Sequence, residues 1–202
     1  MPEEIIVPFS SALKTSPVAT ACRSTLLMAS LGAIQRHGLY ARYKANIAAQ
    51  TLSAIESAVA AMWLPIDVGL AHYAAVEALN LPVQQQLEIG GEVVLKIQQT
   101  LFGTVIRAAR ASGTLSAWTV LARFGFIYDR SFLGGGAQVT QVGPKDARFD
   151  VVGLPLARVI YFRNAYRGFI RAGTELFTSR VFVTDLTRPA AKDHLVFRVA
   201  WA

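Results

Sequence analysis

The sequence predicts an α+β protein in which a helical N-terminal half packs on a four- to five-stranded antiparallel sheet. Two observations predict this class. Apolar residues recur at helical spacing through most of residues 19–129, and from residue 137 onward they alternate with a period of two, which is typical of half-buried strands. The triplet Gly134-Gly135-Gly136 stands between the two patterns and predicts a flexible joint from helix to strand.

Glycine and proline divide the helical half into segments. We expect helices over residues 19–37, 47–62, 68–79, 82–111 and 115–129, with Trp63-Leu64-Pro65 breaking the second. The longest of them contains Gly90 and Gly91, and each glycine costs about 1 kcal/mol relative to alanine in a helix interior. Close approach of another backbone would offset that cost, so we predict tight packing at this point.

The C-terminal part predicts a ββαββ module. We expect strands over residues 137–142 and 148–152 around the turn Gly143-Pro144-Lys145-Asp146, then a helix over 155–173, then strands over 180–184 and 195–201. Prolines and the lack of a period predict an extended arm over residues 1–19. Residues 20–202 are expected to form a single domain, with a helical part (20–131) and the ββαββ part (136–202).

The composition indicates a chain that can bury a large core. Hydrophobic residues make up 53% of the chain and charged residues 16%, a balance that favours a second apolar surface covered in a dimer or by a ligand. We expect a homodimer formed through apolar helices. The apolar runs are shorter than the ~20 residues of a membrane span, and the N-terminus lacks the basic region of a secretory signal. With one cysteine, Cys22, an internal disulfide is excluded, and the chain is expected to be cytoplasmic.

Positive charge is concentrated in the C-terminal half. The net charge is +7, and residues 113–202 carry +6 of it. Arg163, Arg167 and Arg171 lie four residues apart on one predicted helix, so they share a face and are candidates for binding an anion or an acidic protein partner. The alternative is the solvated outer face of an amphipathic helix. Nucleic acid binding through this half is a further alternative, which the spread of the arginines over several elements does not favour.

Motifs for catalysis and metal binding are missing from the sequence. The three histidines lack metal-ligand spacing, and no serine lies in a Gly-x-Ser-x-Gly context, so we predict neither catalytic nor metal-binding residues. His72 lies on a helix beside Tyr73, where it could ligate a haem or a metal, or be a buried histidine without a special role.

A set of aromatic residues could line a ligand pocket between the helices and the sheet, and the alternative is an ordinary hydrophobic core. The candidate pocket residues are Phe102, Trp118, Phe126, Phe162 and Tyr166, together with His72.

Several stretches carry a resemblance to a known superfamily. They are Trp63-Leu64-Pro65 before a helix, the long helix from Pro82, the aromatic helix ending in Tyr128-Asp129-Arg130, the hairpin at Gly143-Pro144, the helix with Gly168-Phe169, and the closing strand Leu195–Trp201. Over residues 60–202 the pattern resembles the superfamily of TRAPP small subunits, 4-vinyl reductase domains and haem-based nitric oxide sensors. It is most similar to a set of uncharacterised bacterial proteins of about 200 residues, common in myxobacteria.

Departures from the superfamily narrow what the resemblance implies. The region from Asp185 to His194 lacks the cysteines that the resemblance to 4-vinyl reductase domains would imply for binding metal, and Tyr128-Asp129-Arg130-Ser131 does not match the Tyr-x-Ser-x-Arg motif of the haem sensors. We therefore expect no cofactor, with a tetrapyrrole or another apolar ligand as an alternative. The resemblance implies a non-enzymatic ligand-binding or protein-interaction module with an apolar pocket. A tetrapyrrole- or lipid-handling carrier or enzyme of 4-vinyl reductase type is the alternative.

Overall fold

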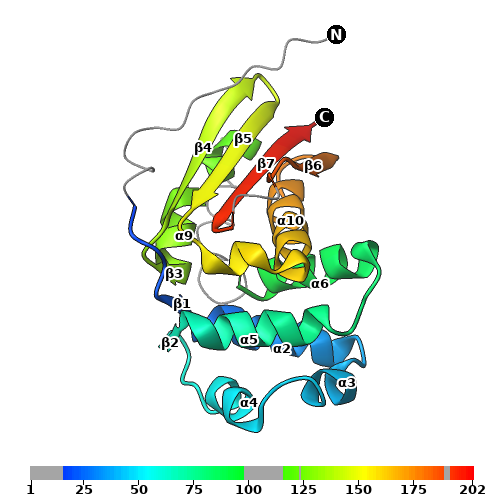
Figure 1. The fold of residues 1–202 in the computed structure, drawn as a ribbon. Coiled ribbons are helices and arrows are strands. Elements are labelled where there is room, and N and C mark those ends of the chain that lie inside the picture. The colour runs from blue at the N-terminus through cyan, green and yellow to red at the C-terminus, as the bar shows by residue number, and fades with distance from the viewer. Residues whose placement is uncertain (1–15, 98–115, 123, 189–191) are drawn as a thin grey trace.

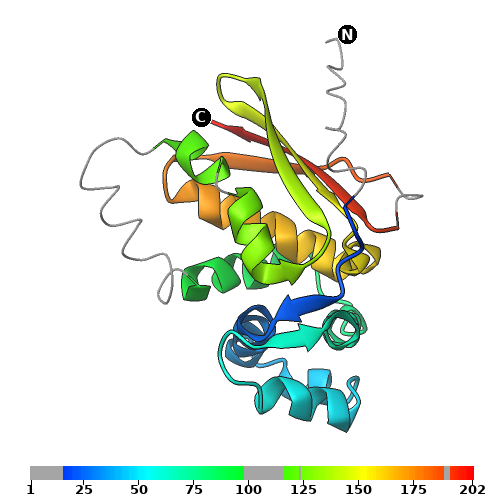
Figure 2. The same ribbon diagram turned by 90° about the vertical axis from the view of Figure 1, so that its left-hand side faces the viewer.

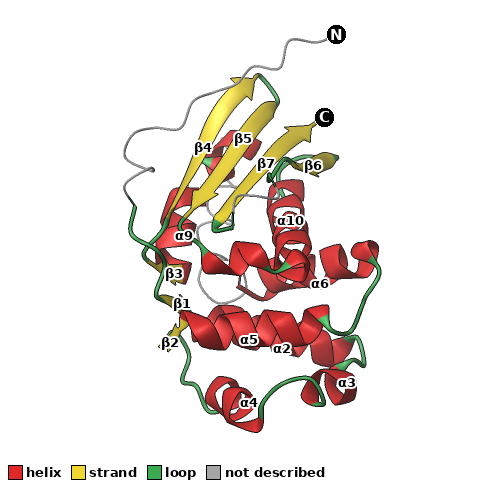
Figure 3. Cartoon of the chain, in the orientation of Figure 1, coloured by secondary structure: helices red, strands yellow, loops and turns green. Residues whose placement is uncertain are grey.

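The computed structural model describes residues 16–97, 116–122, 124–188 and 192–202, and it confirms the α+β class (Figures 1 and 3). The long C-terminal helix, Ile160–Glu175, lies against one side of a four-stranded antiparallel sheet, and the helices of residues 24–77 lie beyond it, away from that sheet. Within the described part of the chain, no helix is long and apolar enough to cross a membrane. The division into an arm and one domain, and the homodimer, stay predictions.

The main sheet is built from the two predicted hairpins in the order β4-β5-β7-β6. Alternation places Phe149 of β5 directly opposite Phe197 of β7, and both side chains are buried towards the helices. The predicted succession of two strands, a helix and two strands is therefore confirmed. The bounds are β4 (Gly136–Gly143), β5 (Asp146–Val152), α10 (Ile160–Glu175), β6 (Val181–Asp185) and β7 (His194–Trp201).

The N-terminal helices differ from the prediction mainly at their ends. The helix expected over 47–62 stops at Glu56, and Ala61 then takes a positive φ of 63°, which a helix cannot continue through. The helix expected over 115–129 is two helices, α8 and α9, and the part expected over 98–111 lies outside the described residues. The bounds are α2 (Ser24–Arg36), α3 (Tyr40–Lys44), α4 (Ala49–Glu56), α5 (Ile66–Glu77), α6 (Val83–Ile97), α8 (Ala117–Leu121) and α9 (Phe124–Ser131).

A second, three-stranded sheet was not predicted from the sequence. Its strands are β1 (Ala21–Arg23), β2 (Trp63–Pro65) and β3 (Phe132–Leu133), in the order β2-β1-β3 (Figure 2). Two or three residues are too few to show a period of two, and the strands come from distant parts of the chain. The helix predicted from Ala19 therefore begins only at Ser24, and the segment predicted as a helix break, Trp63–Pro65, is a strand. This small sheet ties the start of α2 to the end of α9.

The start of α10 is held by a carboxylate from α5. The helix expected over 155–173 begins as a 3₁₀ turn, η2 (Pro155–Arg158), and the α-helix follows from Ile160. Glu77, at the end of α5, accepts a hydrogen bond from the Tyr161 backbone N–H at 3.1 Å. A carboxylate at a helix N-terminus satisfies one unpaired N–H and is favoured by the helix dipole. This bond therefore places Tyr161 relative to α5.

Helices α6 and α10 touch backbone to backbone. A Cβ added to Gly90 of α6 would lie 2.6 Å from the Ala165 Cα, and one added to Gly168 of α10 would lie 2.9 Å from the Leu87 Cα. Only glycine permits this approach, and the tight packing predicted at Gly90 is present. Gly91 is different, because an added Cβ would meet the Ala172 Cβ at 3.4 Å, which is ordinary van der Waals contact.

The two adjacent glycines provide a matched test of this contact. Gly90→Ala should lower the free energy of unfolding by more than about 3 kcal/mol, because α6 and α10 must move apart. Gly91→Ala should leave stability unchanged or raise it by up to about 1 kcal/mol through helix propensity. Urea denaturation of both variants measures the difference, and equal effects would contradict the close approach.

Candidate functional site

A small cavity lies where two helical layers meet. Helices α2 and α5 form one layer, and α6 and α10 form the layer next to the sheet (Figure 1). The cavity between them has a volume of about 20 Å³, room for about one water molecule. We call it the interlayer cavity. Its lining residues are Leu26 and Ser30 of α2, Tyr73 of α5, Ile89, Gly90 and Val93 of α6, and Tyr161, Phe162, Ala165, Tyr166 and Phe169 of α10.

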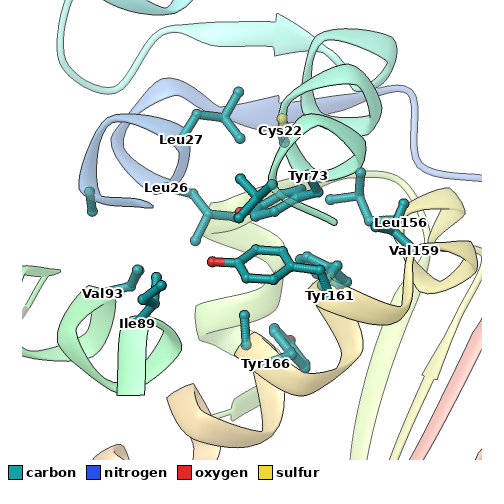
Figure 4. Close-up of a cluster of buried hydrophobic side chains, with 14 of the residues drawn as sticks. Cys22, Leu26, Leu27, Tyr73, Ile89, Val93, Leu156, Val159, Tyr161 and Tyr166 are labelled. Atoms are coloured by element: carbon teal, nitrogen blue, oxygen red, sulfur yellow. The ribbon is translucent and has the colours of Figure 1, made fainter. Parts of the chain in front are cut away.

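The Tyr161 hydroxyl is the main polar feature of this cavity. Its ring is 1% exposed and extends between the layers, with the hydroxyl directed towards Leu26, Ile89 and Val93 (Figure 4). Among the described residues no group hydrogen-bonds to this hydroxyl. The Ser30 hydroxyl lies close enough to oppose the rise that burial causes in the Tyr161 pKa, without reaching hydrogen-bond geometry. A buried polar group without a partner costs about 1–3 kcal/mol, which a bound molecule would recover.

Ser30 is the end of a buried chain of hydrogen bonds. His72 of α5 lies between the Tyr43 hydroxyl, 2.7 Å from its Nδ1, and the Ser30 hydroxyl, 2.9 Å from its Nε2. All three side chains are buried. The bonds link α3, α5 and α2, and they lead from the core of the outer layer to the wall of the interlayer cavity. We call Tyr43, His72 and Ser30 the buried relay.

The site is electrically neutral at neutral pH. Burial lowers the pKa of His72 to about 3, so the imidazole is uncharged. Burial also raises the pKa values of Tyr73, Tyr161 and Tyr166, so their hydroxyls keep their protons. Because none of the lining residues is Asp, Glu, Lys or Arg, an ion entering the cavity would lose its hydration without gaining a counter-charge.

The predicted pocket residues are placed in several different parts of the structure. Phe162 and Tyr166 line the interlayer cavity, and His72 stands behind its wall. Trp118 packs edge-on against Trp201 and donates to the Pro144 carbonyl, far along the sheet. Phe126 is 52% exposed under the guanidinium of Arg130, and Phe102 lies outside the described residues.

The three arginines of α10 make separate contacts within the protein. Arg163 pairs with Asp185 of β6 at 3.0 Å, Arg167 donates to the Val183 carbonyl, and Arg171 lies 3.6 Å from Glu175. Two of them therefore fasten α10 to the edge strand of the sheet. Their role in binding an anion or a partner stays a prediction.

The sequence did not identify Ser30, Tyr43, Tyr73 or Tyr161 as site residues. Ser30 and His72 are 42 positions apart, and Tyr43 and His72 are 29 apart, so no local spacing pairs them. A weak signal existed in Tyr161, because the apolar face of its helix carries tyrosines at 161 and 166 rather than only phenylalanines. A buried tyrosine usually needs a hydrogen-bond partner.

Neither a metal centre nor a reactive thiol is present in the described part of the chain. No three His, Cys, Asp or Glu residues there gather closely enough to hold a metal ion. Cys22 is buried in β1, and burial raises the pKa of its thiol to about 12. At neutral pH this side chain is an uncharged apolar group.

Comparison with solved structures gives the fold class of the chain. It is similar to a variant H-NOX protein from K. algicida in the unliganded Fe(II) form (TM-score 0.67, 10% identity, 89% of this chain and 96% of that one). It is also similar to an oxygen-binding H-NOX domain related to soluble guanylate cyclases, in its oxygen complex (TM-score 0.59, 10%, 89% and 94%). A third is an H-NOX structure concerned with haem distortion (TM-score 0.58, 11%, 89% and 94%).

These similarities establish the fold and no more, because the identities are near 10%. The chain has the fold of H-NOX domains, which are haem-containing sensors of nitric oxide or oxygen. No protein-family model matches the sequence, and no curated protein is similar to it.

Two expectations from the sequence are corrected by these similarities. The assignment to a superfamily of TRAPP small subunits and 4-vinyl reductase domains, nearest to an uncharacterised bacterial family, is wrong; the structural neighbours are H-NOX domains. Of the three groups in the predicted superfamily, the haem-based sensors are the one whose fold the structural comparison supports. The expectation of no cofactor is also wrong, because the structural neighbours bind haem.

The residues around the interlayer cavity do not fit haem in the arrangement described. Both ring nitrogens of His72 are engaged in the buried relay, and the other histidines, His37 and His194, do not line the cavity. Tyrosine can ligate haem iron as phenolate, but burial raises the pKa values of the three lining tyrosines. The volume of about 20 Å³ would also require the two helical layers to separate.

The lowered pKa of His72 predicts a loss of stability in acid. The folded protein binds a proton at His72 only near pH 3, whereas the unfolded chain binds it near pH 6.5. This contribution to stability is therefore complete above pH 6.5 and is lost as the pH falls towards 3, by up to about 1.4 kcal/mol per pH unit.

Urea denaturation between pH 7 and pH 4 measures that dependence, with His72→Gln as the comparison. The variant should show a shallower dependence on pH than the wild type, whatever its stability at pH 7. Identical slopes would mean that His72 is not buried in its neutral form.

Proposed function

We propose that this protein is a ligand-binding regulatory module whose ligand enters the interlayer cavity. The observation that carries the proposal is the Tyr161 hydroxyl, which is buried at the boundary of two helical layers and has no hydrogen-bond partner among the described residues. Native proteins rarely keep such a group unless a water, an ion or a ligand meets it. The H-NOX fold supports the proposal by analogy, since that fold is used for sensing in the structural neighbours.

The layered architecture supports regulation by a ligand. Polar contacts join the two layers. The Glu92 carboxylate of α6 bonds Arg36, the last residue of α2, and His37, which follows it, each at 2.8 Å. A further contact joins α5 to α10, because the Glu77 carboxylate accepts a hydrogen bond from the Tyr161 backbone N–H in the first turn of α10. A ligand larger than water must shift one layer relative to the other, and that displacement would carry the signal.

A tetrapyrrole is the first large ligand to test, because the structural neighbours contain haem. Its entry would need the layers to open, and its iron would have tyrosines rather than a histidine within reach in the described cavity. The second alternative inferred from the sequence, binding of nucleic acid or an acidic partner through the arginine-rich C-terminal half, is less favoured because Arg163 and Arg167 of α10 are engaged with β6.

Filling the cavity tests this proposal. Val93→Phe places a ring in the cavity from α6, and Val83→Phe is the matched control, because Val83 is 51% exposed on the same helix and does not line the cavity. We expect the wild type to retain or take up a ligand at one per chain and Val93→Phe to bind it at least about tenfold more weakly. Val83→Phe should bind like the wild type.

The measurements are native mass spectrometry of the purified full chain and titration with haemin and with a small apolar fluorescent probe, followed by absorbance and emission. Circular dichroism shows whether Val93→Phe remains folded. The proposal fails if the wild type carries no ligand and takes up neither probe, or if both variants bind equally well.

A further inference from the structure

The chain between α4 and β2 forms an exposed apolar loop, Val59-Ala60-Ala61-Met62. Val59 is 73% exposed and Met62 is 42% exposed, and the two alanines between them are exposed as well. Single exposed apolar residues are ordinary in folded proteins, whereas a contiguous apolar run marks a surface that another molecule covers. This loop is therefore a candidate contact point.

The backbone of the loop is hydrogen-bonded to the protein behind it. Ser24, at the start of α2, donates from its hydroxyl to the Val59 carbonyl and from its backbone N–H to the Met62 carbonyl, each at 2.8 Å. Arg23 donates to the Ala61 carbonyl, and the Met62 N–H donates to the Ser24 hydroxyl oxygen at 3.1 Å. Three carbonyls of the loop are therefore paired within the protein, which is what backbone needs before it can enter hydrocarbon.

Two arginines lie beside the loop, each over an aromatic ring. Arg23 of β1 pairs with Trp63 of β2, and its guanidinium lies 3.7 Å from the centroid of the indole. Nε of Arg23 also donates to the Arg130 carbonyl at 3.2 Å, and the guanidinium of Arg130 lies 4.6 Å from the centroid of Phe126. Arg23 thus joins the loop to the end of α9, and β1, β2 and α9 face the viewer together in Figure 2. We call this set the loop surface: Val59, Met62, Trp63, Arg23, Arg130 and Phe126.

The charges of the loop surface point to an anionic partner. Arg23 donates to backbone carbonyls rather than to carboxylates, and Arg130 is exposed, so both arginines add positive charge to this surface. The whole chain carries a net charge of +7, which attracts it to acidic surfaces. Arginine and tryptophan are typical of the headgroup layer of a membrane, with apolar side chains just beyond them.

We propose that the loop surface docks the protein on a membrane containing anionic lipid, with the apolar loop inserted below the headgroups and the two arginines on lipid phosphates. The paired carbonyls favour lipid over an acidic protein, because a protein partner would supply hydrogen bonds that these carbonyls do not need. The docking is peripheral, since it uses a loop and short strands rather than a spanning helix. This inference does not depend on the interlayer cavity.

Vesicle binding by the full chain tests the role of the loop. We expect the wild type to bind vesicles of equal parts phosphatidylcholine and phosphatidylglycerol and to bind phosphatidylcholine vesicles much more weakly. Val59→Asp should bind the anionic vesicles at least about tenfold more weakly, because it removes an inserted apolar group and adds a repelled charge. Val83→Asp is the matched control, since Val83 is 51% exposed on α6, and its effect should be less than about twofold. Co-sedimentation measures the binding, and circular dichroism confirms that both variants are folded.

A second pair of variants tests the arginines. Arg130→Gln should weaken binding to the anionic vesicles about fivefold, the loss expected for one arginine at an anionic surface, and should lessen its dependence on salt. Arg180→Gln removes the same charge from an exposed residue just before β6, away from the loop surface, and should bind like the wild type.

A fluorophore at the loop distinguishes insertion from adsorption by charge. Val59→Cys is labelled with an environment-sensitive dye, with labelled Val83→Cys as the control, because Cys22 is buried and does not compete for the label. On anionic vesicles the emission of the dye should shift to the blue at position 59 and stay unchanged at position 83.

Three results would overturn the inference. They are a wild type that does not bind anionic vesicles, equal binding by the two aspartate variants, and a dye at position 59 that stays in water on the bound protein. Binding to soluble polyglutamate without binding to vesicles would assign the loop surface to an acidic protein partner and would overturn it too.

Discussion

The backbone contact between α6 and α10 determines where the other elements can lie. Glycine at 90 and 168 lets the two helices approach until main-chain atoms touch, which creates a rigid pair with one face towards the sheet. The sheet packs on α10 through alternating apolar residues, and α2 and α5 lie on the opposite side of the pair. If α6 and α10 stood further apart, Tyr161 and Ile89 would not frame a cavity of this size.

Polar groups are buried at the boundary between the layers, although apolar side chains are the usual occupants of buried positions. In the buried relay, His72 is hydrogen-bonded to both Tyr43 and Ser30. The Tyr161 hydroxyl has no hydrogen-bond partner among the described residues. A fully satisfied network stabilises a unique core, whereas an incomplete one is costly unless another molecule completes it. This incomplete end is the reason to assign the boundary a ligand rather than a purely structural role.

The sequence predicted those parts of the fold that depend on local patterns. The two hairpins, α10 and the packing at Gly90 follow from periodicity, turn residues and the cost of glycine in a helix. The three-stranded sheet of β1, β2 and β3 could not be predicted, because its short strands pair only when distant segments meet. The site was recovered in part: Phe162 and Tyr166 do line the cavity, but the contacts of His72 with Tyr43 and Ser30 depend on tertiary packing. Trp118 and Phe126 show that aromatic character alone does not place a residue in a pocket.

The central claim is that the interlayer cavity receives a molecule that pairs with the Tyr161 hydroxyl. A high-resolution crystal structure of the full chain as purified tests it most directly. We predict ordered density for a water or a ligand within hydrogen-bond distance of the Tyr161 hydroxyl, enclosed by α2, α5, α6 and α10. A Tyr161 hydroxyl bonded to a protein atom, with no density and no space beside it, would contradict the account.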